Sequence, residues 1–290
     1  MIKSGINCTA VWRILLPALF SFWVSAVVAQ TSEQTLSFAT QQIEAGNYSV
    51  AGKALSRLVF FDNGIEYPET FELLAETYFR QNDFSNAWHF YDLAAIRADN
   101  DSLRAEFTSL KAACRLYNKE YHAAMIDLMS YQGNTTESQQ WQFDLLAGIA
   151  SFYLYDYKNA EAYFLRCADS SSAPAVIESF RQIKQTEKRY NPRKARVMSF
   201  IIPGSGQLYA GDAKNGLNSF LLVTGFVAVG FGLATSIQFI DAAIIVFPWF
   251  QRYYMGGYQK AYAITLDKQN AAKSEVLLGL MNKLSETAGQ

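Results

Sequence analysis

The fold of this 290-residue chain is decided by the stretch from Phe71 to Ala94, which reads FELLAETYFRQNDFSNAWHFYDLA. Apolar residues recur three or four positions apart on both sides of the polar triplet Gln81-Asn82-Asp83, which is the spacing of one helix face. Small side chains at Ala75 and Ala87 allow two antiparallel helices to approach closely, while the large rings fill the space toward the next pair. The stretch therefore predicts a helix, a polar turn and a second helix.

An aromatic residue three positions before an alanine recurs along the chain. The pairs are Tyr48/Ala51, Phe84/Ala87, Tyr121/Ala124 and Tyr157/Ala160, separated by 36, 37 and 36 residues. A period of this length is typical of stacked helical repeats. The pattern predicts an all-α array of about four helix pairs over residues 30–187. Further small positions are expected at Ala39, Ala113 and Gly148.

These residues resemble the tetratricopeptide repeat family, whose units are helix-turn-helix pairs with the same alternation of small and large side chains. The usual period is about 34 residues, so each unit here is two or three residues longer. The sequences Asp62-Asn63-Gly64 and Gly133-Asn134-Thr135-Thr136 fit longer loops between units. The resemblance covers about residues 32–187. Stacked helices without tetratricopeptide identity are the alternative.

Residues 1–29 have the pattern of a secretory signal peptide. Lys3 and Arg13 are the only charged residues in this segment. The run from Ile14 to Val28 is apolar, and small residues precede a cut at Gln30. An uncleaved membrane anchor is the alternative, but the run is short for a membrane span. Cleavage predicts an exported protein, which we expect to lie in a bacterial cell envelope.

A long uncharged stretch follows the repeats, because no Asp, Glu, Lys or Arg occurs between Lys214 and Asp241. Its length is sufficient to cross a bilayer. Residues 217–236 and 239–258 are therefore predicted to form a transmembrane helical hairpin, within a membrane module over 197–258. An aromatic belt is expected at Trp249, Tyr253, Tyr254, Tyr258 and Tyr262. A buried hairpin of a soluble protein is the alternative.

A glycine-rich motif precedes the predicted hairpin. It consists of Pro203, Gly204, Gly206, Gln207, Tyr209, Gly211 and Asp212. Because proline and glycine break the apolar run, we expect a re-entrant or interfacial segment whose freed backbone groups bond Gln207 or Asp212. The motif resembles the two-transmembrane-helix domain family, which carries a Gly-rich, Tyr-Gly signature before its hairpin. The resemblance implies a membrane module with lipid as its surroundings, and it offers no catalytic residues.

Basic residues are concentrated just before the motif, although the formal net charge of −1 gives no bulk attraction to nucleic acid. The linker 188–196 contains Lys188, Arg189, Arg193, Lys194 and Arg196. Such a cluster contacts anionic lipid or stays solvated, and both interpretations remain open. Basic flanks favour the cytoplasmic side, but a large translocated domain crosses despite them. We therefore expect an inner-membrane protein with its repeats in the periplasm.

The chain offers little reactive chemistry. Cys114 and Cys167 remain after signal removal and occupy positions suited to small buried side chains, and the spacing leaves open whether they pair. His89 and His122 stand in no cluster with metal-ligand spacing. Gly204-Ser205-Gly206 is too short for a nucleophile elbow. The sequence predicts no enzyme, no cofactor, no metal and no small-molecule substrate.

Residues 259–290 have the pattern of an exposed amphipathic helix. Its apolar stripe consists of Leu277, Leu280, Met281 and Leu284, and the opposite side carries Lys273, Glu275, Lys283 and Glu286. The pattern leaves open whether this helix packs on the repeats, binds a partner or lies on the bilayer.

We expect a membrane-anchored scaffold for protein–protein interaction or complex assembly. Stacked repeats bind partners on the concave face, where inner helices of successive units line up. By helix position, the charged residues expected to face a protein partner are Glu76, Arg80, Lys111 and Arg115. The alternative is a subunit of a membrane transport or lipid-handling complex, in which the hairpin is the active part.

Overall fold

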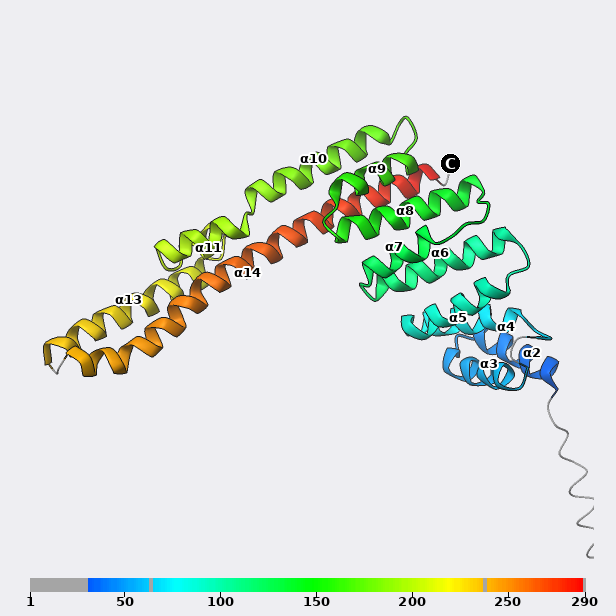
Figure 1. The fold of residues 1–290 in the computed structure, drawn as a ribbon, viewed down its shortest axis with the longest axis horizontal. Helices are drawn as coiled ribbons and strands as arrows, with labels where there is room; N and C mark the ends of the chain where they lie inside the picture. Colours follow the sequence, from blue (N-terminus) through cyan, green and yellow to red (C-terminus); the bar gives the residue numbers. More distant parts are fainter. Residues whose placement is uncertain (1–30, 63–64, 237–238, 289–290) are drawn as a thin grey trace, which may run out of the picture. The chain divides into compact units, whose positions relative to one another are not determined.

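The computed structural model describes residues 31–62, 65–236 and 239–288, and the regular elements in these ranges are all helices (Figure 1). The all-α prediction is therefore confirmed. The predicted signal peptide lies outside the described residues. The chain divides into two compact units, one ending at Leu154 and the other beginning at Tyr155. This boundary falls inside the predicted repeat region 30–187.

The first unit is a succession of helices in which each packs against the next. Its elements are α2 (Ser32–Glu44), α3 (Tyr48–Asp62), α4 (Glu69–Arg80), α5 (Phe84–Arg97), α6 (Asp101–Tyr117), α7 (Tyr121–Met129) and α8 (Glu137–Tyr153). Core side chains come from neighbouring helices, as where Leu55 of α3 meets Leu74 of α4. Phe71 of α4 packs in the same way with Tyr91 of α5. Contacts between sequence neighbours therefore hold this unit together.

One turn geometry recurs between these helices. Gly46, Asn82 and Lys119 have left-handed backbones with φ of 75°, 60° and 62°. In each turn the next residue donates its N–H to the carbonyl five positions earlier, at 2.8 to 3.0 Å. This is the Schellman motif, which ends a helix and redirects the chain. Tyr155, with φ 62°, places a left-handed residue at the start of the second unit.

Small buried residues flank the turns of the first unit. Before the turns they are Ala39, Ala75 and Ala112, and after the turns Ala51, Ala87 and Ala124, all fully buried. A methyl group at these positions allows the paired helices to approach closely. The prediction of Ala113 is wrong by one residue, because Ala112 is the buried one and Ala113 is half-buried. Two adjacent alanines give no local signal of helix register, which tertiary packing decides.

An aspartate–asparagine pair begins three helices. The pairs are Asp83/Asn86 at α5, Asp156/Asn159 at α9 and Asp212/Asn215 at α13. In each pair the carboxylate accepts the asparagine backbone N–H at 3.1 to 3.2 Å and its side-chain amide at 2.6 to 2.7 Å. The aspartate satisfies a backbone donor that a helix start leaves free. The glycine-rich motif therefore ends in the same cap that α5 uses.

The second unit is built around one long helix. Its elements are α9 (Tyr157–Cys167), α10 (Ala173–Arg189), α11 (Pro192–Ile201), α12 (Ser205–Tyr209), α13 (Ala213–Ser236) and α14 (Phe239–Ala288). Helix α14 contacts α10, α11, α12 and α13 along its length. The predicted basic linker 188–196 is mostly helical, because α10 ends at Arg189 and α11 begins at Pro192.

Helix α14 is continuous over 50 residues and contains Pro248. This differs from the two separate helices expected over 239–258 and 259–290. Only Gly256-Gly257 weakens the helix near the expected break, and no polar turn sequence follows. Packing of α11 and α12 along this part of α14 holds it helical.

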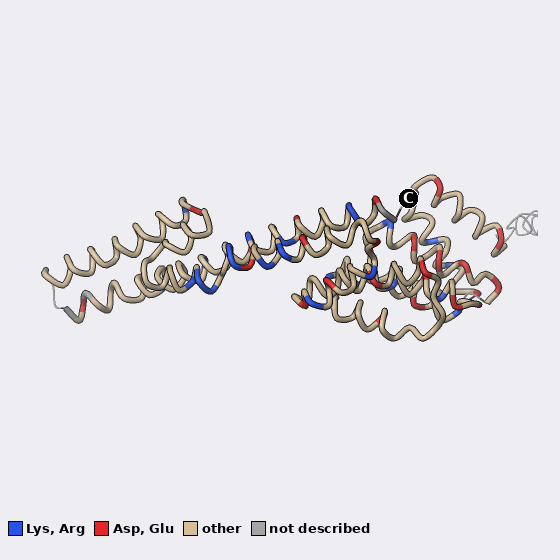
Figure 2. Tube along the Cα trace, turned by 90° about the horizontal axis from the view of Figure 1, so that it is seen from above, with Lys and Arg blue, Asp and Glu red and all other residues tan. Residues whose placement is uncertain are grey.

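Among the described residues, one helix is long and apolar enough to cross a membrane. It covers Ala213–Thr235 within α13, with a mean hydropathy of 1.9, and only 6 % of its apolar window is buried. The expected second span over 239–258 does not meet the same criterion, because Asp241, Gln251 and Arg252 reduce its hydropathy. Figure 2 shows α13 and the start of α14 nearly free of charge, with basic residues gathered along the stretch beyond.

Candidate functional site

The four predicted partner-binding residues do not form one group. Glu76 and Arg80 lie on α4 and form an exposed ion pair, with 3.1 Å between Arg80 Nη2 and Glu76 Oε1. Lys111 and Arg115 lie on α6 and bond within the chain. Lys111 Nζ is 2.9 Å from an Asp92 oxygen and 3.2 Å from Asp127 Oδ1.

A charge cluster joins α5, α6 and α7 around the Lys111 side chain, which is only 12 % exposed. The Arg115 guanidinium lies over the Trp88 ring at 3.9 Å, and its Nε is 3.6 Å from Asp127 Oδ2. The Trp88 indole N–H donates to the same carboxylate at 2.9 Å. Lys111 and Arg115 therefore hold neighbouring helices together. Trp88 and Asp127 were not predicted from the sequence, because they are 39 positions apart.

The glycines of the motif allow three helices to meet closely. Gly204 has a left-handed φ of 90°, and a Cβ there would overlap the Gly216 carbonyl oxygen of α13. A Cβ on Gly206 would overlap the Ala195 carbonyl oxygen of α11. The segment after Pro203 therefore folds as a short helix packed against α11, α13 and α14, and its expected re-entrant or interfacial position stays a prediction.

Gln207 is fully buried and joins three helices at this junction. Its Oε1 accepts from Ser199 Oγ at 2.7 Å, and its Nε2 donates to the Gly257 carbonyl at 2.7 Å. Ser199 Oγ in turn accepts from the Gly206 N–H at 2.9 Å. Buried polar groups are expected to be paired in this way. Gln207 thus links α11, α12 and α14, instead of bonding freed backbone groups beside it.

The remaining motif residues shape the turns around α12. The Tyr209 hydroxyl accepts the Asn191 N–H at 3.1 Å and donates to the Arg189 carbonyl. Gly211 has a left-handed φ of 75°, and Asp212 then caps α13. The hydrogen bond from the Asn215 side chain, followed by that from its backbone, lowers the pKa of Asp212.

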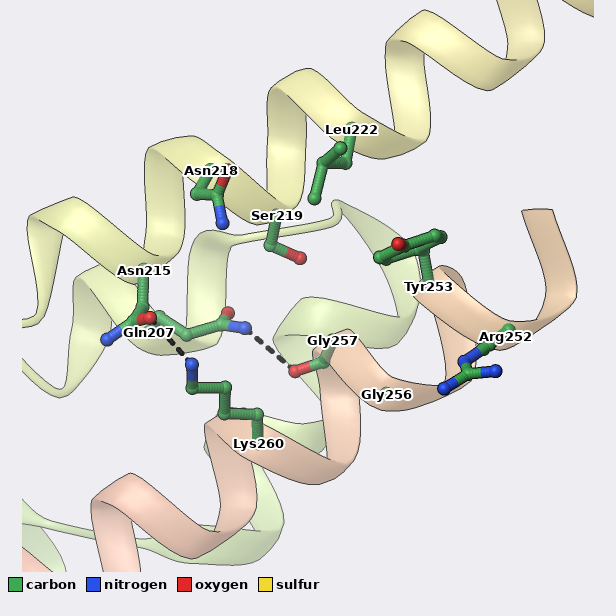
Figure 3. A pocket seen from close by; sticks show the side chains of 10 residues that line it. All are labelled: Gln207, Asn215, Asn218, Ser219, Leu222, Arg252, Tyr253, Gly256, Gly257 and Lys260. Atoms are coloured by element: carbon green, nitrogen blue, oxygen red, sulfur yellow. Dashed lines mark hydrogen bonds between the residues drawn. The ribbon is translucent and has the colours of Figure 1, made fainter. Parts of the chain in front are cut away.

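A pocket of about 300 Å³ opens beside this junction, between α13 and α14 (Figure 3). Helix α13 contributes Asn215, Asn218, Ser219 and Leu222, while Gln207 of α12 borders it. Polar residues thus occupy one side of the first two turns of α13. The spacing of these residues, three or four positions apart, is a helical face, so the sequence carried a signal for this side.

Helix α14 forms the other wall of the pocket. It contributes Arg252, Tyr253, Gly256, Gly257 and Lys260. Lys260 Nζ donates to Asn215 Oδ1 at 2.7 Å, as Figure 3 shows. Neither Arg252 nor Lys260 forms a salt bridge within the described ranges. The pocket therefore carries two positive charges, and no acidic residue lines it.

A buried lysine in α14 was also missed. The amphipathic pattern predicts Lys273 on the exposed side, but the structure corrects this, because the residue is only 2 % exposed. Its Nζ donates to Glu187 Oε1 at 2.8 Å, to the Tyr157 hydroxyl at 3.0 Å and to Gln269 Oε1 at 3.2 Å. The predicted apolar stripe is buried at Leu277, Leu280 and Leu284. This half of α14 packs against α10.

Of the cysteines in the described ranges, Cys114 and Cys167 are both buried, and they do not form a disulfide with each other. Burial raises the pKa of Cys114 to about 12, which makes its thiol unreactive at neutral pH. In the part of the chain that the structure describes, no three His, Cys, Asp or Glu side chains are grouped as metal ligands.

We compared the chain with models of protein families, with curated proteins and with solved structures. None of the three comparisons gives a match. The geometry of the two units is therefore the basis for inferring the function of the chain.

Proposed function

We propose that this chain is a membrane-anchored, non-enzymatic helical-repeat scaffold of the bacterial cell envelope. The observation that carries the proposal is α13, whose apolar stretch Ala213–Thr235 is almost entirely unburied. Neighbouring elements bury an apolar helix inside a soluble protein, whereas an exposed apolar surface of this size is stable against lipid. Helix α13 and residues 239–258 of α14 are proposed to form a membrane hairpin.

The first unit is proposed to be a tetratricopeptide-like array that presents its concave face to a protein partner. The recurrent left-handed turns at Gly46, Asn82 and Lys119 support this proposal, since they follow the same 36- and 37-residue spacing as the sequence pairs. Glu76 and Arg80 are exposed and available for contact. Removal of residues 1–29 as a signal peptide would place this array in the periplasm and the hairpin in the inner membrane.

Alkaline carbonate extraction of bacterial membranes tests the anchor. We expect the full chain to stay in the membrane pellet. Replacing Val227 and Phe231 by arginine should release it, because each charge in a span costs about 2.5–3.5 kcal/mol on insertion scales. Both residues are exposed on α13, so their replacement leaves the fold intact. Arginine at exposed Val197 of α11 is the control and should not release the chain.

The scaffold role is tested by purification from detergent-solubilised membranes. We expect protein partners to co-purify with the full chain and to be lost when residues 31–154 are deleted. This deletion follows the boundary of the first compact unit. Retention of the same partners by the second unit alone would overturn the scaffold and favour the transport or lipid-handling alternative, which the pocket between α13 and α14 supports.

A further inference from the structure

The pocket between α13 and α14 presents hydrogen-bond donors that the chain does not use. Ser219 Oγ is buried and has no hydrogen-bond partner among the described residues. The neighbouring Asn218 amide also forms no hydrogen bond within the described ranges. An unpaired buried hydroxyl is unfavourable in a folded protein. A ligand oxygen in the pocket would relieve this cost.

The positive charge of the pocket indicates which charge such a ligand would carry. Arg252 and Lys260 lie on one face of α14, eight residues apart, and both line the space. Among the described residues, the one hydrogen bond of Lys260 goes to the neutral Asn215 oxygen, and Asp212, which attracts it, does not line the space. Arginine and lysine bind phosphate through charge-assisted hydrogen bonds. Two cations and no lining carboxylate therefore favour an anion.

Two glycines shape the wall that α14 contributes. A Cβ on Gly256 would meet no atom within 4 Å, whereas one on Gly257 would lie 2.6 Å from Ser219 Oγ. Glycine inside a helix is destabilising relative to alanine. The missing side chain of Gly256 leaves open space at this wall, and that of Gly257 allows α14 to pack against Ser219.

An apolar groove lies further along the same two helices. This groove, of about 230 Å³, lies between Phe226, Val227 and Gly230 of α13 and Val246, Phe247 and Phe250 of α14. The Phe226 ring stacks on the pocket residue Tyr253 at 5.3 Å. A cationic pocket at one end and an apolar groove beyond it match a molecule with an anionic head and a hydrocarbon tail.

We propose that this site binds an anionic glycerophospholipid, with its phosphate between Arg252, Lys260 and Ser219 and one acyl chain in the groove. The inference rests on the membrane anchoring of the proposed function. A free phosphate would leave the groove uncovered. A choline head group would bring a positive charge toward both cations.

The test uses the full chain, purified in neutral detergent and stripped of lipid, with native mass spectrometry as the readout. Phosphatidylglycerol and phosphatidylcholine with the same acyl chains are the two lipid probes, and inorganic phosphate is the third. We expect one phosphatidylglycerol per chain, bound at least tenfold more tightly than phosphatidylcholine. Equal binding of the two lipids would overturn the proposal.

Variants then assign the site. Arg252→Gln with Lys260→Gln should weaken phosphatidylglycerol binding about 25-fold, from about fivefold for each basic residue. The matched control, Lys184→Gln with Lys214→Gln, removes two exposed charges outside the pocket and should stay within twofold. Gly256→Leu fills the open space and should also abolish binding.

Three results would contradict the lipid site. They are unchanged binding by the double variant, equal loss in the control, and displacement of the lipid by inorganic phosphate at equal concentration, which would indicate a free-phosphate site. Failure of the anchor is a separate result. In that case the unmodified chain would leave the membrane in carbonate, whatever its lipid preference in micelles.

Discussion

Among single residues, Lys273 has the surroundings least expected from its sequence position. Burial lowers the pKa of its ammonium group, but the hydrogen bonds to Glu187 and Tyr157 outweigh this and raise it above 10.5. Three oxygen atoms accept from the group. A buried charge is tolerated in a protein when it is paired and hydrogen-bonded in this way.

Lys273→Met should destabilise the contact of α14 with α10 by about 1.5–3 kcal/mol, the usual range for hydrogen bonds to a charged group. Native-state hydrogen exchange of the α10 amides measures this change locally. Exposed Lys184 of α10 provides the control, and Lys184→Met should stay within about 0.5 kcal/mol. An equal effect of both variants would contradict a specific role for Lys273.

Lys273 also makes the stability of the second unit depend on pH. The folded chain holds the Lys273 proton more tightly than the unfolded chain, since its pKa is raised. The contribution of Lys273 to the free energy of unfolding should therefore be constant below about pH 10.5 and decrease above that value. The raised pKa of Tyr157 acts in the same direction. Hydrogen exchange should show that Lys273→Met loses the same amount of local stability at pH 7 and at pH 9. A loss that disappears by pH 9 would exclude a raised pKa of Lys273.

Gly206→Ala should disrupt the junction around α12, because its methyl group would overlap the Ala195 carbonyl oxygen. The affected neighbour is backbone, so we expect the free energy of unfolding to decrease by about 1–3 kcal/mol, the usual cost of overpacking a core. Protease susceptibility of α11 and α12 is the measurement. Gly279→Ala is the control, since a Cβ there meets no atom within 4 Å, and it should stabilise α14 by about 0.5–1 kcal/mol. Equal protease resistance of Gly206→Ala and the parent would contradict the close approach.

At the scale of elements, the helix–helix turns differ in how well their left-handed residue suits its backbone. Asn82 tolerates this conformation, whereas Lys119 carries a cost of about 1–2 kcal/mol. We expect Lys119→Asn to stabilise the first unit by about 1 kcal/mol and Asn82→Lys to destabilise it by a similar amount. Hydrogen exchange of the α4–α7 amides in increasing urea measures both changes. The pair is informative because both side chains are exposed, and shifts of the same sign would refute the backbone explanation.

Element type was more predictable than element extent. The spacing of rings and alanines located the helices on both sides of Asn82 and Lys119, because small buried residues must recur where paired helices touch. The glycines of the motif correctly indicated an unusual backbone. They did not reveal that α12 is a helix, since the reason for Gly204 and Gly206 is close approach to Gly216 and α11. Such contacts between different segments produce no signal in the local sequence.

For the whole molecule, the division at Leu154 and Tyr155 predicts two unfolding events. Each compact unit has its own buried side chains, such as Leu74 in the first and Leu280 in the second. Hydrogen exchange in increasing urea should give one midpoint for amides of the first unit and another for those of the second. Asn82→Lys should move only the first midpoint, and Lys273→Met only the second. A single shared transition would contradict this division.

The candidate site shows why sequence reasoning reached only part of the molecule. Charged residues such as Lys111 and Lys273 were placed on exposed faces because most lysines are solvated. Their partners Asp127 and Glu187 are 16 and 86 positions away, so the chain must fold before the pairing exists. The pocket was missed for the same reason, since Ser219 lies on a different helix from the two basic residues that share it.

The unbroken length of α14 has a mechanical consequence. After Pro248 it continues for another 40 residues to Ala288, which is about 60 Å of helix at 1.5 Å per residue. Tilting a stiff rod of that length by about 5° moves its far tip by about 5 Å. Changes in bilayer thickness commonly alter helix tilt. A thicker or thinner membrane around the proposed anchor would then displace α14 at Lys273, where this helix packs against α10.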